Sequence, residues 1–247
     1  MQDLIRRAAQ ALRTARKTIA LTGAGISAES GIPTFRDPGG LWERYDPEEY
    51  ATIEAFRRAP AKVWRMMKDF TELKTAKPNP GHLGLAQLEQ MGFLSCIITQ
   101  NIDNLHQDAG SRDVIEFHGN MRQVICQSCD KLLALEEISL TTLPPYCGCG
   151  GVFKPAGVFF GEPIPAHALY RSQEAAQSCD LIIVVGTSAV VYPAADIPRV
   201  AKEAGAQVIE INPEPTELTG WVSDFLIQEK AGVAIPQIID ELKAMAS

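Results

Sequence analysis

The amino-acid sequence predicts an α/β protein with a doubly wound, mostly parallel, Rossmann-like sheet. Five short apolar runs show little polar alternation, which is typical of parallel strands buried on both faces. Helical patterns lie between most of these runs, and polar clusters follow four of them. The runs span residues 18–21, 94–99, 181–185, 208–211 and 224–227.

Three segments carry helix signals. Residues 3–16 repeat apolar side chains at helical spacing. Residues 80–90 and 193–204 each open at a proline and are followed within two residues by Gly92 or Gly205. Proline at the start of a segment and glycine just past its end are typical of helices. Helices that alternate with strands favour a sheet covered on both faces.

Two stretches interrupt this alternation and are predicted to be insertions. Residues 37–77 have helical character and are rich in Trp, Arg and Met, whereas residues 124–153 contain four cysteines. The remaining segments, 1–36, 78–123 and 154–247, then form one discontinuous sheet domain. The insertions would form a smaller unit with a helical part and a cysteine-bearing part.

Composition restricts the class of function. The 247 residues include 30 acidic and 23 basic side chains, a formal net charge of −7, and 46% of them are hydrophobic. This balance excludes a disordered chain and argues against direct nucleic-acid binding, which depends on basic groups at phosphates. No apolar run approaches the roughly 20 residues of a membrane helix, and the first residues lack a secretory signal. We expect a cytoplasmic monomer that does not enter membranes.

A glycine-rich segment, Gly23-Ala24-Gly25, directly follows the first apolar run. Glycines at this position let the backbone approach a phosphate, as in dinucleotide-binding folds. The spacing is not G-x-G-x-x-G, so a tight turn between strand and helix is an equal alternative. Phe35 and Arg36 follow on a loop and suggest a lid over a bound dinucleotide. The alternative is that the Phe35 ring packs in the core and that Arg36 is an ordinary solvated side chain.

Four residues, Gln100, Asn101, Ile102 and Asp103, place amide and carboxylate groups at the end of the second run. A carboxamide such as nicotinamide offers donors and an acceptor, which an Asp together with Asn or backbone groups can satisfy. The chemistry therefore favours nicotinamide recognition. Capping of a helix N-terminus by Asn101 or Asp103 is the alternative.

His118 is one of four histidines and stands before Gly119 at the end of a β-like segment. This position presents its imidazole at a turn. Histidine is the usual general base near neutral pH because its unperturbed pKa is about 6.5. For His82, His106 and His167 a structural role is the better interpretation.

Four cysteines form two close pairs, Cys126 with Cys129 and Cys147 with Cys149. Two pairs at this separation are typical of a structural zinc ribbon, in which four thiolates close a tetrahedral site. A redox dithiol or unrelated free thiols are the alternatives. A closed zinc site would hold the smaller unit in place without taking part in the chemistry.

In their order along nearly the whole chain, these motifs resemble the sirtuin family of NAD-dependent protein lysine deacylases. Phe160-Gly161-Glu162, Gly186-Thr187-Ser188 and Asn212-Pro213-Glu214 add to the resemblance. It implies that the acyl oxygen of a modified lysine attacks NAD, nicotinamide leaves, and His118 activates a ribose hydroxyl as general base. The products would be nicotinamide, free lysine and 2′-O-acyl-ADP-ribose.

The resemblance also implies roles for individual residues. NAD would be the co-substrate, one structural zinc ion the metal, and acyl-lysine proteins or peptides the partners. Asn101 and Asp103 would act in catalysis with His118 by orienting the ribose and nicotinamide. NAD contacts are expected from Gly23, Ala24, Gly25, Phe35, Arg36, Gln100, Asn101, Ile102, Asp103, Gly186, Thr187, Ser188, Asn212, Glu214 and Ala231. Acyl-lysine contacts are expected from Val158, Phe159, Phe160 and Val191, for which plain core packing is the alternative.

One departure from some relatives bears on the acyl group. Relatives that prefer succinyl or malonyl groups carry a Tyr-x-x-Arg in the helical insertion, and this Arg pairs with the acyl carboxylate. Met67 and Phe70 align with those positions here. We therefore expect neutral acyl groups, acetyl best, with longer aliphatic chains tolerated because Met66 and Met67 are adaptable.

Two other classes of function fit parts of the sequence. One is a zinc-ribbon interaction module that uses NAD structurally or not at all. The other is an NAD enzyme of a different kind, an ADP-ribosyl transferase or a dehydrogenase. The dehydrogenase is disfavoured because no second catalytic domain remains after the sheet domain and the two insertions are counted.

Overall fold

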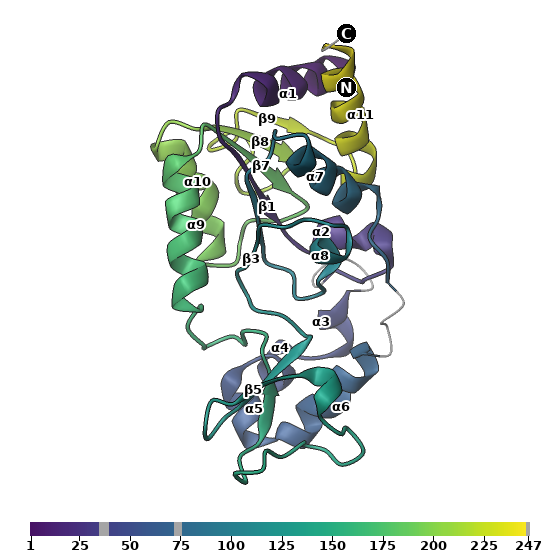
Figure 1. The fold of residues 1–247 in the computed structure, drawn as a ribbon, viewed down its shortest axis with the longest axis vertical. Helices are drawn as coiled ribbons and strands as arrows, with labels where there is room; N and C mark the ends of the chain where they lie inside the picture. The colour runs from purple at the N-terminus through teal and green to yellow at the C-terminus, as the bar shows by residue number, and fades with distance from the viewer. Residues whose placement is uncertain (35–39, 72–75, 246–247) are drawn as a thin grey trace.

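The computed structural model describes residues 1–34, 40–71 and 76–245 of the chain. These residues form a large lobe around a six-stranded sheet and a small lobe at one end of the molecule (Figure 1). The strands of the large sheet are β1 Thr18–Thr22, β2 Cys96–Thr99, β3 Val114–Glu116, β7 Leu181–Val185, β8 Gln207–Ile211 and β9 Phe225–Ile227.

Every strand of the large sheet runs parallel to its neighbours, in the order β3-β2-β1-β7-β8-β9. Counted within this sheet alone, the order is 3-2-1-4-5-6, the doubly wound order of dinucleotide-binding folds. The order reverses between β1 and β7, and ligands bind outside the carboxyl ends of the strands at such a point. All residues of β1 and β7 are buried, which explains their continuous apolar character. The predicted fold class is confirmed.

Helices cover both faces of the large sheet (Figure 1). One apolar cluster joins the sheet to α1 Gln2–Thr14, α7 Pro80–Gln90 and α11 Ala231–Ala244. A second cluster joins the opposite face to α9 Ala166–Ser178 and α10 Ile197–Glu203. The apolar side chains of each helix therefore fix on which side of the sheet it lies.

The predicted helix over residues 193–204 is wrong at its start. A 3₁₀ turn, η3 Ala194–Asp196, precedes α10, and Pro198 lies in the first turn of α10. Proline has no N–H to continue a helix from the preceding turn, so a new helix begins there. The first predicted helix also ends early, at Thr14, because Ala15 is extended.

The small lobe combines helices and a three-stranded antiparallel sheet of order β5-β4-β6. Phe56 and Trp64 from the helices pack in one apolar cluster with Val124 and Phe153 from the sheet. The indole Nε1 of Trp64 also donates to the Phe153 carbonyl at 2.7 Å. The two segments therefore share one core. Its elements are α3 Leu41–Arg44, α4 Pro47–Tyr50, α5 Ile53–Arg58, α6 Pro60–Thr71, β4 Gln123–Cys126, β5 Leu132–Ala134, η2 Leu135–Glu137 and β6 Phe153–Pro155.

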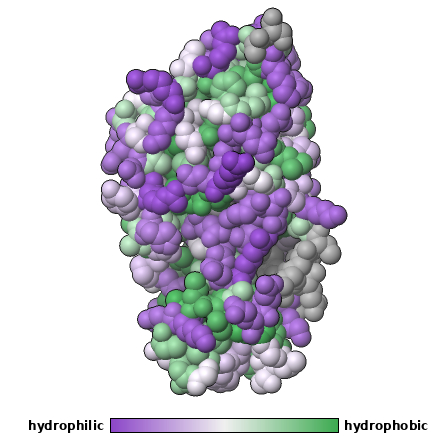
Figure 2. All heavy atoms as spheres, in the orientation of Figure 1, coloured by the Kyte–Doolittle hydropathy of each residue, from purple (hydrophilic) through white to green (hydrophobic). Residues whose placement is uncertain are grey.

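The surface differs between the two lobes. On the face shown in Figure 2, hydrophobic side chains gather on the small lobe, next to a broad hydrophilic region. Over the part of the chain that the structure describes, none of the helices combines the length and the apolar character needed to cross a membrane.

Candidate active site

Polar residues that follow separate strands contact one another at the carboxyl end of the large sheet. Asn101, which follows β2, donates from Nδ2 to the carbonyl of Gly23, which follows β1, at 3.1 Å. Gln100 donates from Nε2 to Oγ1 of Thr187, which follows β7, at 3.0 Å. The parallel topology thus brings three of the four predicted strand-end clusters together.

The glycine loop packs directly against the end of β7. Gly23 caps a short helix, α2 Ala24–Ser27, and the Gly25 N–H donates to the Gly186 carbonyl at 2.8 Å. A Cβ on Gly25 would lie 2.8 Å from both Cα and the carbonyl oxygen of Gly186. Glycine is therefore required for this close approach. The loop is a tight strand-to-helix turn, and the amide of Gly25 is engaged within it.

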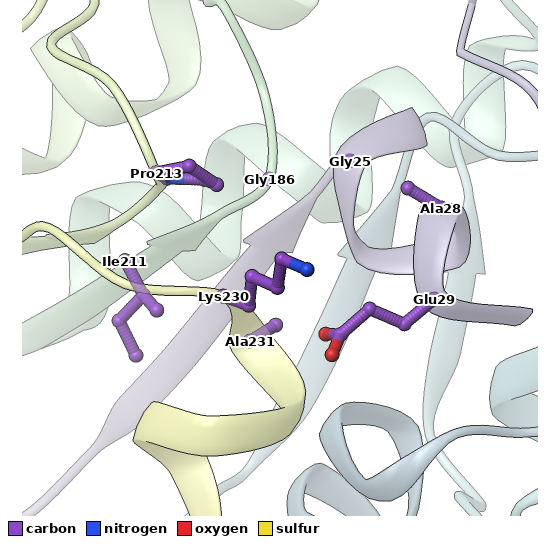
Figure 3. A pocket seen from close by; sticks show the side chains of 8 residues that line it. All are labelled: Gly25, Ala28, Glu29, Gly186, Ile211, Pro213, Lys230 and Ala231. Atoms are coloured by element: carbon purple, nitrogen blue, oxygen red, sulfur yellow. The ribbon is translucent and has the colours of Figure 1, made fainter.

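A cavity of about 200 Å³ opens beside this turn (Figure 3). Gly25, Gly186 and Ala231, all predicted NAD contacts, line it. Lys230 and Glu29 extend toward one another across it from opposite sides. Ligand pockets usually measure about 300–1,000 Å³, so this cavity suits only part of a dinucleotide. Its other lining residues are Ala28, Ile211 and Pro213.

His118 lies two residues beyond the end of β3 and is half-buried. Its Nδ1 lies 3.1 Å from the carbonyl oxygen of Gln100. Burial lowers the pKa of His118 below its ordinary value, and the hydrogen bond to Gln100 opposes part of this change. The imidazole is therefore neutral at pH 7, as a general base must be.

The turn that carries His118 is fixed by Glu116 and Gly119. The Glu116 carboxylate accepts from the side-chain amides of Asn104 at 2.7 Å, Gln107 at 2.8 Å and Asn120 at 2.8 Å. Gly119 has φ of +70°, and a Cβ there would lie 2.2 Å from the Ala156 carbonyl oxygen. Glu116 thus ties the segment after β2 to the segment after β3.

Asp103 makes two different contacts with its two carboxylate oxygens. Oδ2 accepts from the Ser27 hydroxyl at 2.7 Å, and Oδ1 accepts from the Leu105 N–H at 3.0 Å. Leu105 begins α8 Leu105–Asp108, so one oxygen does help to start a helix. Asn101 instead donates to Gly23 and, at 3.1 Å, to the Ser27 hydroxyl. The N-cap position of α8 is Asn104, so neither Asn101 nor Asp103 is the N-cap residue, although Asp103 contacts the first N–H of this helix.

Two buried histidines lie beside this polar cluster. Nε2 of His82 is 3.4 Å from the Ser27 hydroxyl, and Nε2 of His106 is 2.9 Å from Oγ1 of Thr22. Their rings meet edge to face with centroids 4.9 Å apart. Burial lowers the pKa of His82 to about 4 and that of His106 to about 3, so both are neutral at pH 7.

The other predicted NAD contacts lie at the same end of the sheet. Thr187 is buried and Ser188 exposed directly after β7. After β8, Nδ2 of Asn212 donates to the Glu214 carbonyl at 2.7 Å, which closes a turn. The Ile102 carbonyl accepts from Met121 at 3.2 Å. Ala24 opens α2, whereas Phe35 and Arg36 lie outside the described residues.

Three of the predicted acyl-lysine residues, Val158, Phe159 and Phe160, lie on a segment that contacts both the histidine turn and the helices of the small lobe. The Val158 N–H donates to the His118 carbonyl at 2.8 Å, which places this segment directly against the histidine turn. Phe160 is 45% exposed, whereas Phe159 is buried and packs edge to face on Phe56. Val191 is half-buried on the segment that precedes η3. The Phe159 ring therefore packs in the core of the small lobe, which was the alternative to a contact with acyl-lysine.

The four cysteines of the small lobe converge. Their sulfur atoms all lie within 4.8 Å of one another, with 3.5 Å between Cys126 and Cys149 and 3.9 Å between Cys129 and Cys147. Sulfurs about 2.3 Å from a tetrahedral zinc are about 3.8 Å apart, whereas a disulfide would bring two of them to about 2.05 Å. The four thiols fit one structural zinc ion.

Comparison with known proteins identifies the family. The Sir2 family model matches residues 23–193. NAD-dependent protein deacylase 2 of Pyrobaculum aerophilum is 52% identical over 237 residues, which cover 95% of this chain and 94% of that relative. NAD-dependent protein deacylase 2 of Archaeoglobus fulgidus is 45% identical over 252 residues, 100% of this chain and 99% of the relative. The chain belongs to the Sir2 family.

Solved Sir2 structures agree with this assignment. A Sir2 homologue in complex with NAD superimposes with a TM-score of 0.90 at 43% identity, covering 100% of this chain and 95% of the other. The structure of Sir2Af2 bound to a myristoylated histone peptide superimposes with a TM-score of 0.82 at 40% identity, covering 100% of this chain and 99% of the other. The resemblance to sirtuins is confirmed, and the chain is an enzyme of the NAD-dependent protein deacylase family.

Several residues of this Sir2 site were missed from the sequence. Ser27 stands next to the glycine loop, and its hydroxyl contacts both Asn101 and Asp103. Lys230 and Glu29 line the cavity. Glu29 also accepts from the Gly232 N–H at 2.9 Å, near the start of α11. Ser27 belongs to the motif Gly23-Ala24-Gly25-Ile26-Ser27 and could have been found from the sequence, whereas Lys230 carries no local signal beyond its position before Ala231.

Proposed function

We propose that this site removes acyl groups, mainly acetyl, from lysine side chains of proteins, with NAD as co-substrate. The products are nicotinamide, free lysine and 2′-O-acyl-ADP-ribose. The observation that carries the proposal is the position of His118. Its neutral imidazole is oriented by Gln100, whose side chain contacts Thr187 at the end of β7, where the cavity opens.

NAD spans the carboxyl end of the sheet in this proposal. The adenosine half lies in the cavity between Gly186 and Ala231, which Pro213 also lines, and Asn212 and Glu214 flank Pro213 in the chain. Thr187 and Ser188 hold the adjoining ribose, and Gly23, Ala24 and Gly25 lie against the phosphates. Phe35 and Arg36 follow that loop in the sequence and are also proposed to contact NAD.

The nicotinamide half faces Gln100, Asn101, Ile102 and Asp103. Asn101 is held by Gly23 and Ser27, and Asp103 by Ser27 and Leu105, so both side chains are preoriented. A preoriented site costs little reorganisation when the substrate binds. Asn101 and Asp103 are therefore assigned to orienting the ribose and the nicotinamide.

The chemistry proceeds in two parts. The acyl oxygen of the modified lysine forms a bond to the anomeric carbon of the nicotinamide ribose while the bond to nicotinamide breaks. Nε2 of His118 then takes the proton of a ribose hydroxyl, whose oxygen attacks the imidate-like carbon. Water completes the transfer, so that lysine leaves and the acyl group remains on ADP-ribose.

We place the acylated lysine along the backbone of Val158, Phe159 and Phe160, with Val191 on the second segment that contacts it. An extended peptide would add its backbone between these two segments, as in other strand-addition complexes. Val158 is hydrogen-bonded to His118, so a side chain bound there ends close to the base. The myristoylated histone peptide in the related Sir2Af2 structure supports an acyl-lysine substrate.

We further propose a cytoplasmic location and a monomeric state without nucleic-acid binding. None of the six cysteines forms a disulfide, which suits a reducing compartment. The net charge of −7 opposes binding to phosphate backbones. Light scattering of the purified protein and a gel-shift assay with duplex DNA test the last two points.

Mass spectrometry of the reaction products tests the proposed activity. The protein is incubated with NAD and acetyl-lysine peptide, and again without NAD. We expect 2′-O-acetyl-ADP-ribose and nicotinamide in equal amounts with the deacetylated peptide. ADP-ribosylated protein, NADH, or deacetylation without NAD would each refute it.

A further inference from the structure

A buried cation, Lys154, lies in the small lobe and has no part in the proposed chemistry. Only 4% of the residue is exposed. Its Nζ donates to the Pro155 carbonyl at 2.9 Å and the Gly157 carbonyl at 2.8 Å, and it lies 3.0 Å from Oε2 of Glu162. It also lies 4.6 Å from the centroid of the Phe159 ring. A buried charge is tolerated only with partners of this kind.

All of these partners belong to residues 155–162, the segment that carries Val158, Phe159 and Phe160. Oε2 of Glu162 accepts from the Phe159 N–H at 2.8 Å, and the Glu162 N–H donates to the Phe159 carbonyl at 3.0 Å. The segment therefore folds around the ammonium group of Lys154. We call residues 155–162 the acyl loop.

The outer side of the acyl loop is held by other elements. The Phe160 N–H donates to the Ala51 carbonyl at 2.9 Å, and the Ile53 N–H donates to the Phe160 carbonyl at 3.0 Å. The Val158 N–H binds the His118 turn. Lys154 supplies the inner anchor, and the loop thus has a fixed shape on the path from the surface to His118.

We propose that the Lys154–Glu162 ion pair positions the acyl loop for the acylated lysine, an inference that rests on the proposed function. Burying two charges is weak evidence for stability, because an apolar pair of similar volume is often as stable. The ammonium group of Lys154 instead selects one backbone conformation of the acyl loop, because its N–H groups must reach two carbonyls and a carboxylate at the same time. Lys154 is a positioning residue, since it acts through Val158, Phe159 and Phe160.

Replacement of Lys154 by Met keeps an unbranched side chain that is one atom shorter and removes the hydrogen-bond donors. The Pro155 and Gly157 carbonyls and the Glu162 carboxylate then lose their shared partner, and Glu162, whose side chain is 19% exposed, can turn toward water. We expect the KM for an acetyl-lysine peptide to rise about tenfold or more, because small displacements of binding groups are costly. The KM for NAD should stay within about twofold, because the cavity lies on the large lobe.

The test compares Lys154→Met with Glu162→Gln, the double variant, and a matched control, Leu135→Ala. Leu135 is buried in the same lobe and apolar cluster but belongs to η2, outside the acyl loop. Peptide KM and NAD KM are measured for each, together with melting temperature. If the ion pair acts as a unit, the double variant resembles either single variant. A rise in peptide KM for Leu135→Ala equal to that for Lys154→Met would show mere destabilisation and overturn the inference.

Hydrogen exchange of the free protein separates this inference from the proposed function. In Lys154→Met, the Phe159 amide should exchange faster, while the amides near the cysteine cluster keep their protection. Unchanged exchange at Phe159 would overturn the positioning role, whether or not the protein deacylates peptides. Absence of deacylation by the unaltered protein, with the expected change in exchange, would refute only the proposed function.

Discussion

Nδ1 of His118 and the carbonyl oxygen of Gln100 lie 3.1 Å apart. A carbonyl can only accept a hydrogen bond, so Nδ1 carries the proton of the neutral imidazole. The lone pair is then on Nε2, which is free to take a proton from a substrate. Gln100, which follows β2, thus sets the tautomer of His118, the proposed general base after β3.

Replacement of His118 by Ala should abolish most of the deacylation while the fold persists. General-base catalysis contributes about 10²–10⁴-fold to rate, so a loss of that size in kcat is expected. Product formation is followed by mass spectrometry, and melting temperature and zinc content serve as controls. Deacylation at the original rate would show that another group is the base.

The activity should persist at pH values at which an exposed histidine would already be protonated. Burial lowers the pKa of His118, and the base must be neutral to act. As pH falls, kcat/KM should reach half of its plateau only at a pH below about 6.5, the ordinary histidine pKa. The measurement is kcat/KM between pH 5 and pH 8, at fixed ionic strength. An acidic limb centred at or above the ordinary pKa would contradict the assignment.

The parts of the site that sequence could predict are those that follow long apolar strands. Gly25 and Gly186 each come directly after such a run, and a parallel sheet brings these strand ends together. The strand order has no local signal. β3 has only three residues, and its register with β2, Ile97 beside Val114, appears only in the structure.

The sequence also does not reveal the roles of Lys154 and Lys230, because residues from distant segments form the surroundings of these side chains. Lys154 follows the cysteine cluster in sequence and would be expected in water, because lysine is rarely buried without a partner. Its burial depends on Glu162 and on two carbonyls of the acyl loop. Lys230 likewise gains its significance only when the start of α11 meets the glycine loop across the cavity.

Loss of one zinc ligand should unfold the cysteine-bearing part of the small lobe. Cys126→Ala is expected to lower zinc content and melting temperature together, because metal binding is coupled to folding in such sites. Deacylation should fall as well, since the acyl loop continues from β6 of the same sheet. Cys96→Ala, at a buried thiol on β2, is the control and should retain zinc. Full activity of Cys126→Ala without zinc would contradict a structural role.

Acetyl-lysine should be a better substrate than succinyl-lysine on the same peptide. A succinyl carboxylate requires a cation at the end of the acyl site. Met67 occupies one of the two aligned positions and is buried in the apolar cluster of the small lobe, and the side chain of Phe70 lies outside the described residues. Initial rates on matched acetyl, succinyl and longer aliphatic peptides provide the measurement. Succinyl removal as fast as acetyl removal would refute this preference.

A methyl group at Gly25 should impair NAD binding and stability together. In Gly25→Ala the new Cβ would meet backbone atoms of Gly186 at 2.8 Å, and backbone cannot move aside as a flexible side chain can. Overpacking of this kind costs about 1–3 kcal/mol, and each kcal/mol lowers the melting temperature of a chain this long by about 2–4 °C. Because both glycines line the cavity, the KM for NAD should rise more than the KM for the peptide. Gly148→Ala is the control, since no atom outside its two chain neighbours lies within 4 Å of its Cβ position. A variant of Gly25 with unchanged melting temperature and NAD affinity would show that the two strand ends are not in close contact in solution.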